Sequence, residues 1–229
     1  MPELLPVEAK WPIADRSKLQ LFSLNTPNGI KIAVALEELG VPYEAHKVRI
    51  GQGEQFTEAF KSISPNSKIP AIVDPNGPGG RPLALMESGA ILIYLAEKTG
   101  RLIPEDPAKR FQCLQWLFFQ VGHIGPMFGQ FGHFFKYAKD KCDHPYPVER
   151  YTNEAKRLLG VLETQLTSRE YLVDEFSIAD IATFPWVNAL DVSYGASEIL
   201  SLAAFPRVNA WLERCKARPS YQIGKGVAG

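Results

Sequence analysis

The 229-residue sequence has little cysteine and no excess of charge of either sign. Its three cysteines, Cys113, Cys142 and Cys215, lie far apart, form no Cys-x-x-Cys pair, and are all absent from the first 112 residues. This spacing predicts neither a disulfide framework nor a cysteine metal site, and it fits a reducing, cytoplasmic setting. Lys plus Arg equals Asp plus Glu, at 25 each. The sequence therefore lacks the basic character expected of a nucleic-acid-binding protein.

Long apolar runs and metal-ligand patterns are also lacking. The longest uncharged apolar run, residues 90–96, is far too short to span a membrane, so no membrane association is expected. The first sixteen residues have no apolar core of the kind a signal peptide needs, and we expect residues 1–17 to form a surface arm. The four histidines lack metal-ligand spacing, so we expect no metal site.

The stretch from Asn25 to Gly29 is the feature around which the rest is organised. An alternating apolar run, residues 19–24, predicts a strand before it. After it, apolar residues spaced for one helix face lead to Gly40, which predicts a helix and its C-terminal end. Either Thr26, followed by Pro27 at the first helical position, or Asn28 is expected to cap that helix. The turn is then either an ordinary cap or a site where the helix N-terminus binds an anion.

The remainder of the first part predicts the order β-α-β-α-β-β-α over residues 18–100. The β-α-β unit at its start favours a parallel strand pair. Pro70 is expected at a strand end, because proline cannot donate to the ladder. Ser88 is expected to cap the last helix. The later expected elements are a strand at 42–48, a short helix at 54–63 with Phe56 and Phe60 on one face, a strand at 68–73, a hairpin turn at 74–80, a strand at 81–86 and a helix at 88–97.

Everything after a linker at residues 101–107 is expected to be helical, as a second domain over residues 108–229. An aromatic-rich run with several glycines predicts one long bent helix, or two, between residues 110 and 139. Such a run is typical of a core or a subunit interface. Two more helices are expected at 147–166 and from Pro206 to about 217. Between them, Ser177 to Asp180 has the spacing of a capping box.

The first domain has the element order of a thioredoxin-like fold but lacks that fold's Cys-x-x-Cys. The corresponding position, where the first strand meets the first helix, holds Thr26-Pro27-Asn28-Gly29. If thiol chemistry takes place there, the sulfur must arrive on a ligand.

Three further motifs resemble the glutathione transferase superfamily, over about residues 18 to 222. They are Ser64-Pro65-Asn66-Ser67-Lys68-Ile69-Pro70-Ala71-Ile72, Glu87-Ser88-Gly89-Ala90-Ile91-Leu92-Ile93-Tyr94-Leu95 and Ser177-Ile178-Ala179-Asp180. Within it, Thr26-Pro27-Asn28-Gly29-Ile30-Lys31-Ile32, Gln115-Trp116-Leu117-Phe118-Phe119-Gln120-Val121-Gly122 and Gly125-Pro126-Met127 resemble the nu class. That class includes bacterial disulfide-bond oxidoreductases and is related to the fungal nitrogen-regulator branch. The resemblance implies a thioredoxin-like α/β domain followed by an all-α domain.

The resemblance also implies a site for glutathione. Thr26 would donate to the sulfur, with Asn28 beside it. The main chain of Ile69, before a cis Pro70, would pair with the cysteinyl part of the peptide. Glu87 would take the ammonium, and Ser88 with its helix N–H groups the γ-glutamyl carboxylate.

Three outer residues complete this implied site. Gln55 and Lys68 would reach the glycyl end, and Arg150 would reach the mouth of the site from the helical domain. Several residues of the implied site have simpler explanations: Glu87 as a surface charge at a helix start, Ser88 as a mere cap, Lys68 as a solvated lysine at a strand end, and Arg150 as the partner of Glu149 or Glu154 on its own helix.

The resulting hypothesis is a homodimeric, cytoplasmic enzyme that binds glutathione and glutathione disulfide and reduces small disulfides without using a protein cysteine. Two alternatives stay open at this point. One is a conventional glutathione S-transferase acting on electrophiles, and the other is a non-enzymatic, glutathione-binding regulatory protein. The sequence lacks the Asn/Gln-rich N-terminal tract that would favour a prion-like version of the latter.

Overall fold

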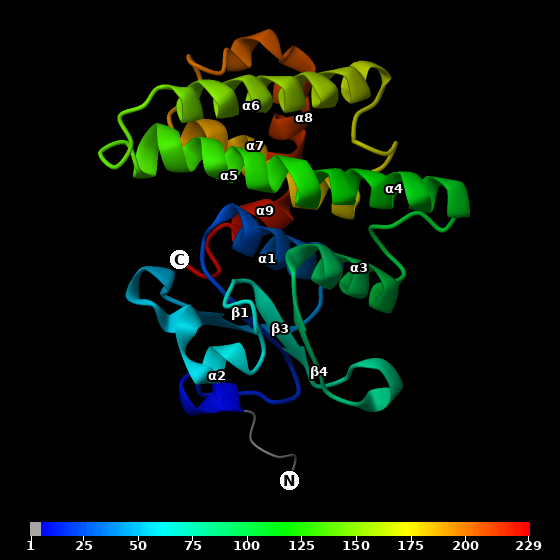
Figure 1. The fold of residues 1–229 in the computed structure, drawn as a ribbon. Helices are drawn as coiled ribbons and strands as arrows, with labels where there is room; N and C mark the ends of the chain where they lie inside the picture. The colour runs from blue at the N-terminus through cyan, green and yellow to red at the C-terminus, as the bar shows by residue number, and fades with distance from the viewer. Residues whose placement is uncertain (1–5) are drawn as a thin grey trace. The chain divides into compact units, whose positions relative to one another are not determined.

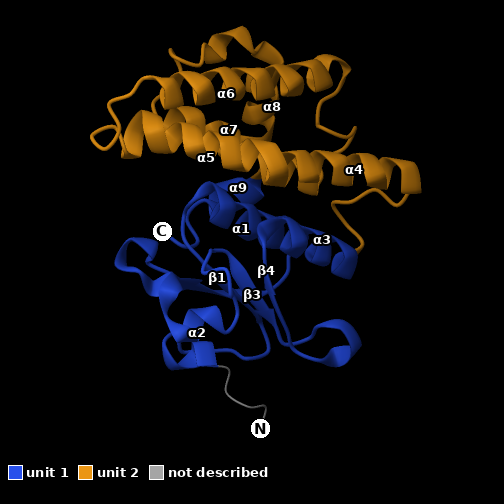
Figure 2. Ribbon diagram, viewed as in Figure 1, with its two compact units in different colours: residues 1–99, 219–229 blue, residues 100–218 orange. Residues whose placement is uncertain are grey.

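A computed structural model describes residues 6–229, and the chain divides into two compact units (Figure 2). Unit 1 contains residues 1–99 together with 219–229, and unit 2 contains residues 100–218. The division differs from the expected one at the C-terminus, because the last eleven residues belong to unit 1 and not to the helical domain. Among the described residues, no helix is long and apolar enough to cross a membrane.

Unit 1 is built on a four-stranded sheet in the order β2-β1-β3-β4. Its strands are β1 (Leu19–Ser23), β2 (Tyr43–Lys47), β3 (Ala71–Asp74) and β4 (Leu83–Met86). β1 pairs with β2 in parallel, as the β-α-β order predicts, while β3 is antiparallel to both β1 and β4. Pro70 lies just before β3, as expected of a residue that cannot donate to the ladder. All five residues of β1 are buried, which is typical of a strand covered on both faces.

The helices of unit 1 are α1 (Pro27–Leu39), α2 (Glu58–Lys61), α3 (Ser88–Thr99) and α9 (Pro219–Gly224) (Figure 1). α1 ends at Gly40, which has the left-handed φ of 66° of a glycine cap. The helix expected at 54–63 is wrong in extent, because Thr57 is extended and caps a single turn, α2. As a result Phe60 is buried while Phe56 is 60% exposed, so the two rings do not share a face.

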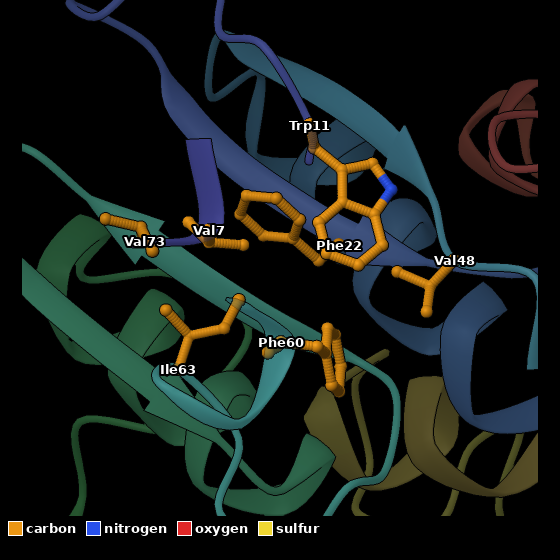
Figure 3. Close-up of a cluster of buried hydrophobic side chains, with 8 residues drawn as sticks. Val7, Trp11, Phe22, Val48, Phe60, Ile63 and Val73 are labelled. Atoms are coloured by element: carbon orange, nitrogen blue, oxygen red, sulfur yellow. The ribbon is translucent and has the colours of Figure 1, made fainter. Parts of the chain in front are cut away.

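The N-terminal segment adds two side chains, Val7 and Trp11, to the core of unit 1, so the expectation of a surface arm is wrong at these positions. Residues 12–17 are exposed or half-buried, as a surface arm would be. Val7 is fully buried and Trp11 is 7% exposed. Trp11 meets the rings of Phe22 and Phe60 edge to face, at centroid distances of 5.9 and 6.0 Å (Figure 3). Its indole N–H donates to the carbonyl of Lys47 at 2.9 Å. The segment is ordered in this way because the sheet needs apolar cover on the face that α2 alone is too short to bury.

α9 is a helix that the sequence analysis did not predict, and it packs against α1. Ser220 donates to Glu38 at 2.6 Å, and Asn25 donates to the carbonyl of Lys225 at 2.5 Å. Gly224 lies close to the backbone of Val34: a Cβ on Gly224 would come within 2.9 Å of the Val34 backbone nitrogen. This close packing is why the end of the chain belongs to unit 1.

Unit 2 is helical, as expected. Its α-helices are α4 (Pro107–Phe119), α5 (Gly125–Gly132), α6 (Tyr146–Gln165), α7 (Ile178–Val192) and α8 (Pro206–Lys216). The run expected as one bent helix or two is a succession of α4, a π-helical segment η5 (Gln120–Ile124), α5 and a second π-helical segment η6 (His133–Tyr137). The capping box at the start of α7 is confirmed: the Ser177 N–H donates to Asp180 at 3.0 Å, and its hydroxyl accepts from Ala179. The buried carboxylate of Asp180 also accepts from Trp211 at 2.8 Å.

Candidate glutathione site

The strand register brings the predicted site segments of unit 1 together at one end of the strands of its sheet. Phe22, near the end of β1, pairs with Ala71 at the start of β3, and Ala71 pairs with Met86 at the end of β4. Three connections therefore lie at the same end of the sheet: the one that follows β1, the one that precedes β3 and the one that follows β4. These three connections carry the Thr26 turn, the Ile69–Pro70 peptide and the Glu87–Ser88 pair.

Thr26 is the N-cap of α1, which decides between the two caps that the sequence allowed. Its backbone is extended (φ −116°, ψ 163°), Pro27 occupies the first helical position, and Oγ1 accepts from the N–H of Gly29 at 3.3 Å. Because this bond uses an oxygen lone pair, the hydroxyl hydrogen stays available to donate elsewhere. Gly29 is required here, since a Cβ at that position would overlap the carbonyl oxygen of Leu24.

Glu87 and Ser88 form the entrance to α3, and Ser88 does not have the capping role that the sequence predicted for it. The carbonyl of Glu87 accepts from Ile91 at 2.9 Å, and α3 begins at Ser88, so Ser88 is the first helical residue and not the cap. Glu87 has a φ of 68°, in the left-handed region that non-glycine residues seldom occupy. Its exposed carboxylate accepts from the Asn66 amide at 3.5 Å. Residues held in this backbone region cluster at active sites and ligand-binding sites, which makes Glu87 a candidate site residue.

Lys31 joins the Thr26 turn to the Glu87–Ser88 pair, and the sequence analysis did not select it. Its side chain is only 1% exposed, and Nζ donates to Oδ1 of Asn28 at 2.8 Å and to Oγ of Ser88 at 3.2 Å. Burial lowers the pKa of Lys31 to about 7, and the negative charge of Glu87 opposes that change. The signal that could have found it is a lysine three residues after Asn28, next to the apolar positions of α1.

The other predicted residues of unit 1 lie as follows. The Ile69–Pro70 peptide is cis, as the resemblance implied, with Pro70 buried and Ile69 half-buried. Gln55 is half-buried, and its Oε1 is a buried acceptor without a hydrogen-bond partner in the described structure. The Lys68 side chain is exposed, while its carbonyl accepts from the Ser64 hydroxyl at 2.8 Å.

Arg150 lies in unit 2, on α6, and is exposed. It lines a cavity of about 470 Å³ together with Met127, Tyr146, Tyr151 and other residues of the same unit. Glu154, which the sequence offered as an alternative partner for Arg150, accepts two hydrogen bonds from Arg157 at 2.8 Å each.

Comparison with known proteins identifies the family. Residues 26–98 match the model of the glutathione S-transferase N-terminal domain, and residues 145–214 match that of its C-terminal domain. The disulfide-bond oxidoreductase YfcG of Escherichia coli is 48% identical over 204 residues, which are 88% of this chain and 92% of that protein. This chain belongs to the glutathione S-transferase family.

Two solved structures of glutathione transferases have nearly the same fold. The enzyme from Pseudomonas putida, solved with one glutathione disulfide per subunit, has a TM-score of 0.97 and 51% identity, and 98% of each chain is covered. The enzyme from Burkholderia graminis, solved with two glutathione molecules per subunit, has a TM-score of 0.95 and 54% identity, and covers 96% of this chain and 92% of its own.

In this glutathione S-transferase, two of the three cysteine thiols are poorly suited to redox chemistry. All three cysteines are free and lie in unit 2, whereas the turn with Thr26 lies in unit 1. Burial raises the pKa of the Cys113 thiol and raises that of Cys215 still further, so both are held in the unreactive protonated form. Among residues 6–229 there is also no group of three or more His, Cys, Asp or Glu side chains that could hold a metal ion.

Proposed function

We propose that this protein is a glutathione-dependent thiol–disulfide oxidoreductase that uses the thiol of bound glutathione and no cysteine of its own. The observation that carries the proposal is the turn at the start of α1. Thr26 and Asn28 occupy the helix N-terminus where a thioredoxin-like redox protein would have its cysteines. A relative solved with glutathione disulfide and another solved with two glutathiones support a site that accepts sulfur in both oxidation states.

The groups of unit 1 match the chemical groups of glutathione one by one. Thr26 donates to the sulfur, and the positive end of α1 favours its thiolate. Glu87 binds the ammonium, while Ser88 and the first N–H groups of α3 bind the γ-glutamyl carboxylate. The main chain of Ile69 lies just before β3 and pairs with the cysteinyl backbone as an added strand.

Three outer residues are assigned to the rest of the ligand. Gln55 reaches the glycyl end, where the amide N–H of the glycyl residue would provide a donor for its buried Oε1. Lys68 supplies a positive charge near the glycyl carboxylate, and Arg150 supplies another at the mouth of the site.

The reaction takes place in two exchanges. The thiolate of a first glutathione attacks one sulfur of the disulfide, forms a mixed disulfide and releases the other sulfur as a thiolate. The thiolate of a second glutathione attacks the glutathione sulfur of the mixed disulfide, which gives glutathione disulfide and releases the second substrate thiolate. Two glutathiones are thus oxidised while one disulfide is reduced to two thiols, and the two glutathione protons end on the products.

We further propose a homodimer in the cytoplasm. Phe111, Phe118 and Val121 are exposed along α4 and η5, at 71%, 63% and 37%, and an apolar surface of this kind is typical of a subunit contact. Three unpaired cysteines fit a compartment in which thiols stay reduced. Light scattering on the purified protein measures the oligomeric state directly.

The test is steady-state reduction of a small dialkyl disulfide by glutathione, with conjugation of a chromogenic electrophile measured in parallel. The matched variant replaces Cys113, Cys142 and Cys215 by serine. We expect the variant to keep the wild-type rate of disulfide reduction. Loss of that rate in a folded variant would refute the cysteine-free mechanism.

Two other results would replace the proposed function. Conjugation that outruns disulfide reduction would identify a conventional transferase acting on electrophiles. Tight glutathione binding with no turnover above the uncatalysed rate would identify a binding protein.

A further inference from the structure

The buried amine of Lys31 is unusual for a lysine and needs a reason. Lysine almost always keeps its charged end in water, because removing that charge from water is costly. Here the side chain is 1% exposed and lies between two segments that are 57 residues apart in the sequence. Its amine donates to Asn28 and Ser88, two residues to which the proposed function gives a role in glutathione binding.

The chemistry of the amine fixes how each partner is oriented. The protonated amine has three hydrogens to donate and the neutral amine has two, so Lys31 can donate to both partners in either form. Asn28 must therefore turn its amide oxygen toward Lys31, which leaves the NH₂ group as the end that faces away. Ser88 likewise accepts through its oxygen and keeps its hydroxyl hydrogen to donate. Without Lys31, either polar group could rotate and present an acceptor in place of a donor.

We propose that Lys31 is a positioning residue that fixes Asn28 and Ser88 as hydrogen-bond donors to the two anionic ends of glutathione, its thiolate and its γ-glutamyl carboxylate. This inference rests on the proposed function and deepens it. Lys31 acts through its neighbours, because its own side chain is almost fully covered. One buried amine thereby orients a hydrogen-bond donor at each end of the site, Asn28 on α1 and Ser88 on α3.

The experiment compares wild type with Lys31→Met, which keeps the length and apolar stem of the side chain and removes the donors. The pKa of the bound glutathione thiol is measured from the ultraviolet absorbance of the thiolate as a function of pH. We expect it to rise by about one pH unit in the variant, which corresponds to losing about one hydrogen bond to a charged group. The affinity for S-methylglutathione, which has no thiol, reports the carboxylate end and is expected to fall about three- to tenfold.

Lys98→Met is the matched control. Lys98 also lies in unit 1, and it donates to a buried acid, Asp74, at 2.5 Å and to the carbonyl of Asn76 at 2.7 Å, instead of to Asn28 and Ser88. Its replacement is expected to lower stability and to leave the pKa of the bound thiol unchanged. A purely structural role for Lys31 would make the two variants alike, with lower stability and an unshifted thiol.

A double variant separates positioning from a direct effect of the charge. If Lys31 acts through Asn28, adding Lys31→Met to Asn28→Ala changes the thiol pKa little beyond Asn28→Ala alone. Fully additive shifts would overturn the positioning role. If Lys31→Met does not fold, Asn28→Asp decides, since it keeps the oxygen that faces Lys31 and loses the donor. An unshifted thiol pKa in Asn28→Asp would overturn the inference.

The proposed function and the inference fail in different ways. If wild type does not bind glutathione, the proposed function is wrong. If wild type binds it and lowers the thiol pKa, and Lys31→Met does so equally, the inference alone is wrong.

Discussion

Thr26 gives a sharp test of the site, because its hydroxyl has two separable roles. The oxygen caps α1 by accepting from Gly29 at 3.3 Å, and the hydrogen is proposed to donate to the glutathione sulfur. Thr26→Ser keeps both roles. Thr26→Val keeps the shape of the side chain and loses both.

The expected magnitudes follow from these two hydrogen bonds. Losing the cap costs about 1 kcal/mol of unfolding free energy, and the 3.3 Å length of this bond places it at or below that figure. Losing a hydrogen bond to a thiolate costs about 1.5–3 kcal/mol of binding energy for the charged form. That loss is about 10- to 100-fold in kcat/KM and about one to two units in the pKa of the bound thiol.

The assay measures both quantities on the same proteins. Urea denaturation gives the unfolding free energy, and a pH titration of the thiolate absorbance with glutathione bound gives the thiol pKa. Initial rates of disulfide reduction at subsaturating glutathione give kcat/KM. We expect Thr26→Ser to lie within about threefold of wild type and Thr26→Val to show the full loss.

Two outcomes would refute this reasoning. If Thr26→Val keeps both kcat/KM and the thiol pKa of wild type, the hydroxyl is not a donor to sulfur. If Thr26→Ser falls as far as Thr26→Val, the methyl group and not the hydroxyl is what the site requires.

Three further predictions concern the scaffold. Asp180→Ala should lower the unfolding free energy by about 4 kcal/mol or more in urea titrations, because it removes a buried acceptor from several donors, Trp211 among them. Trp11→Ala should cost about 3–5 kcal/mol in the same assay, because a buried indole is lost from the sheet face. The unfolding free energy should rise between pH 7 and 10.5, because in that window the unfolded chain holds a proton on Lys31 that the folded chain releases. Lys31→Met should reduce that rise.

Each of these has a clear contradicting result. A loss below 1 kcal/mol in Asp180→Ala would mean that its donors find other partners. A similarly small loss in Trp11→Ala would mean that the N-terminal segment behaves as the surface arm that the sequence predicted. If the unfolding free energy of Lys31→Met rises with pH as steeply as that of wild type, the amine of Lys31 keeps its charge on folding.

The sequence by itself determined the features that depend on neighbouring residues. Gly40 after an apolar helix face and the capping box of Ser177 with Asp180 are examples, because caps form through hydrogen bonds within one turn of backbone. The sequence also predicted a cap at the start of α1, and the structure decided that Thr26, not Asn28, forms it. The parallel pair β1–β2 follows from the β-α-β order. The missing cysteine at the Thr26 turn pointed in the same way to a sulfur supplied by a ligand.

Only the tertiary structure decided which residues meet across long separations. Nothing in the sequence marks Lys31 as part of the site, and only the fold places its amine between Asn28 and Ser88. Trp11 and α9 likewise lie near the two ends of the sequence, where no local pattern predicts burial. In the structure each packs into unit 1, with Trp11 and Tyr221 of α9 buried. No local pattern encodes such contacts, because their free energy comes from surfaces that exist only once the sheet and its helices have formed.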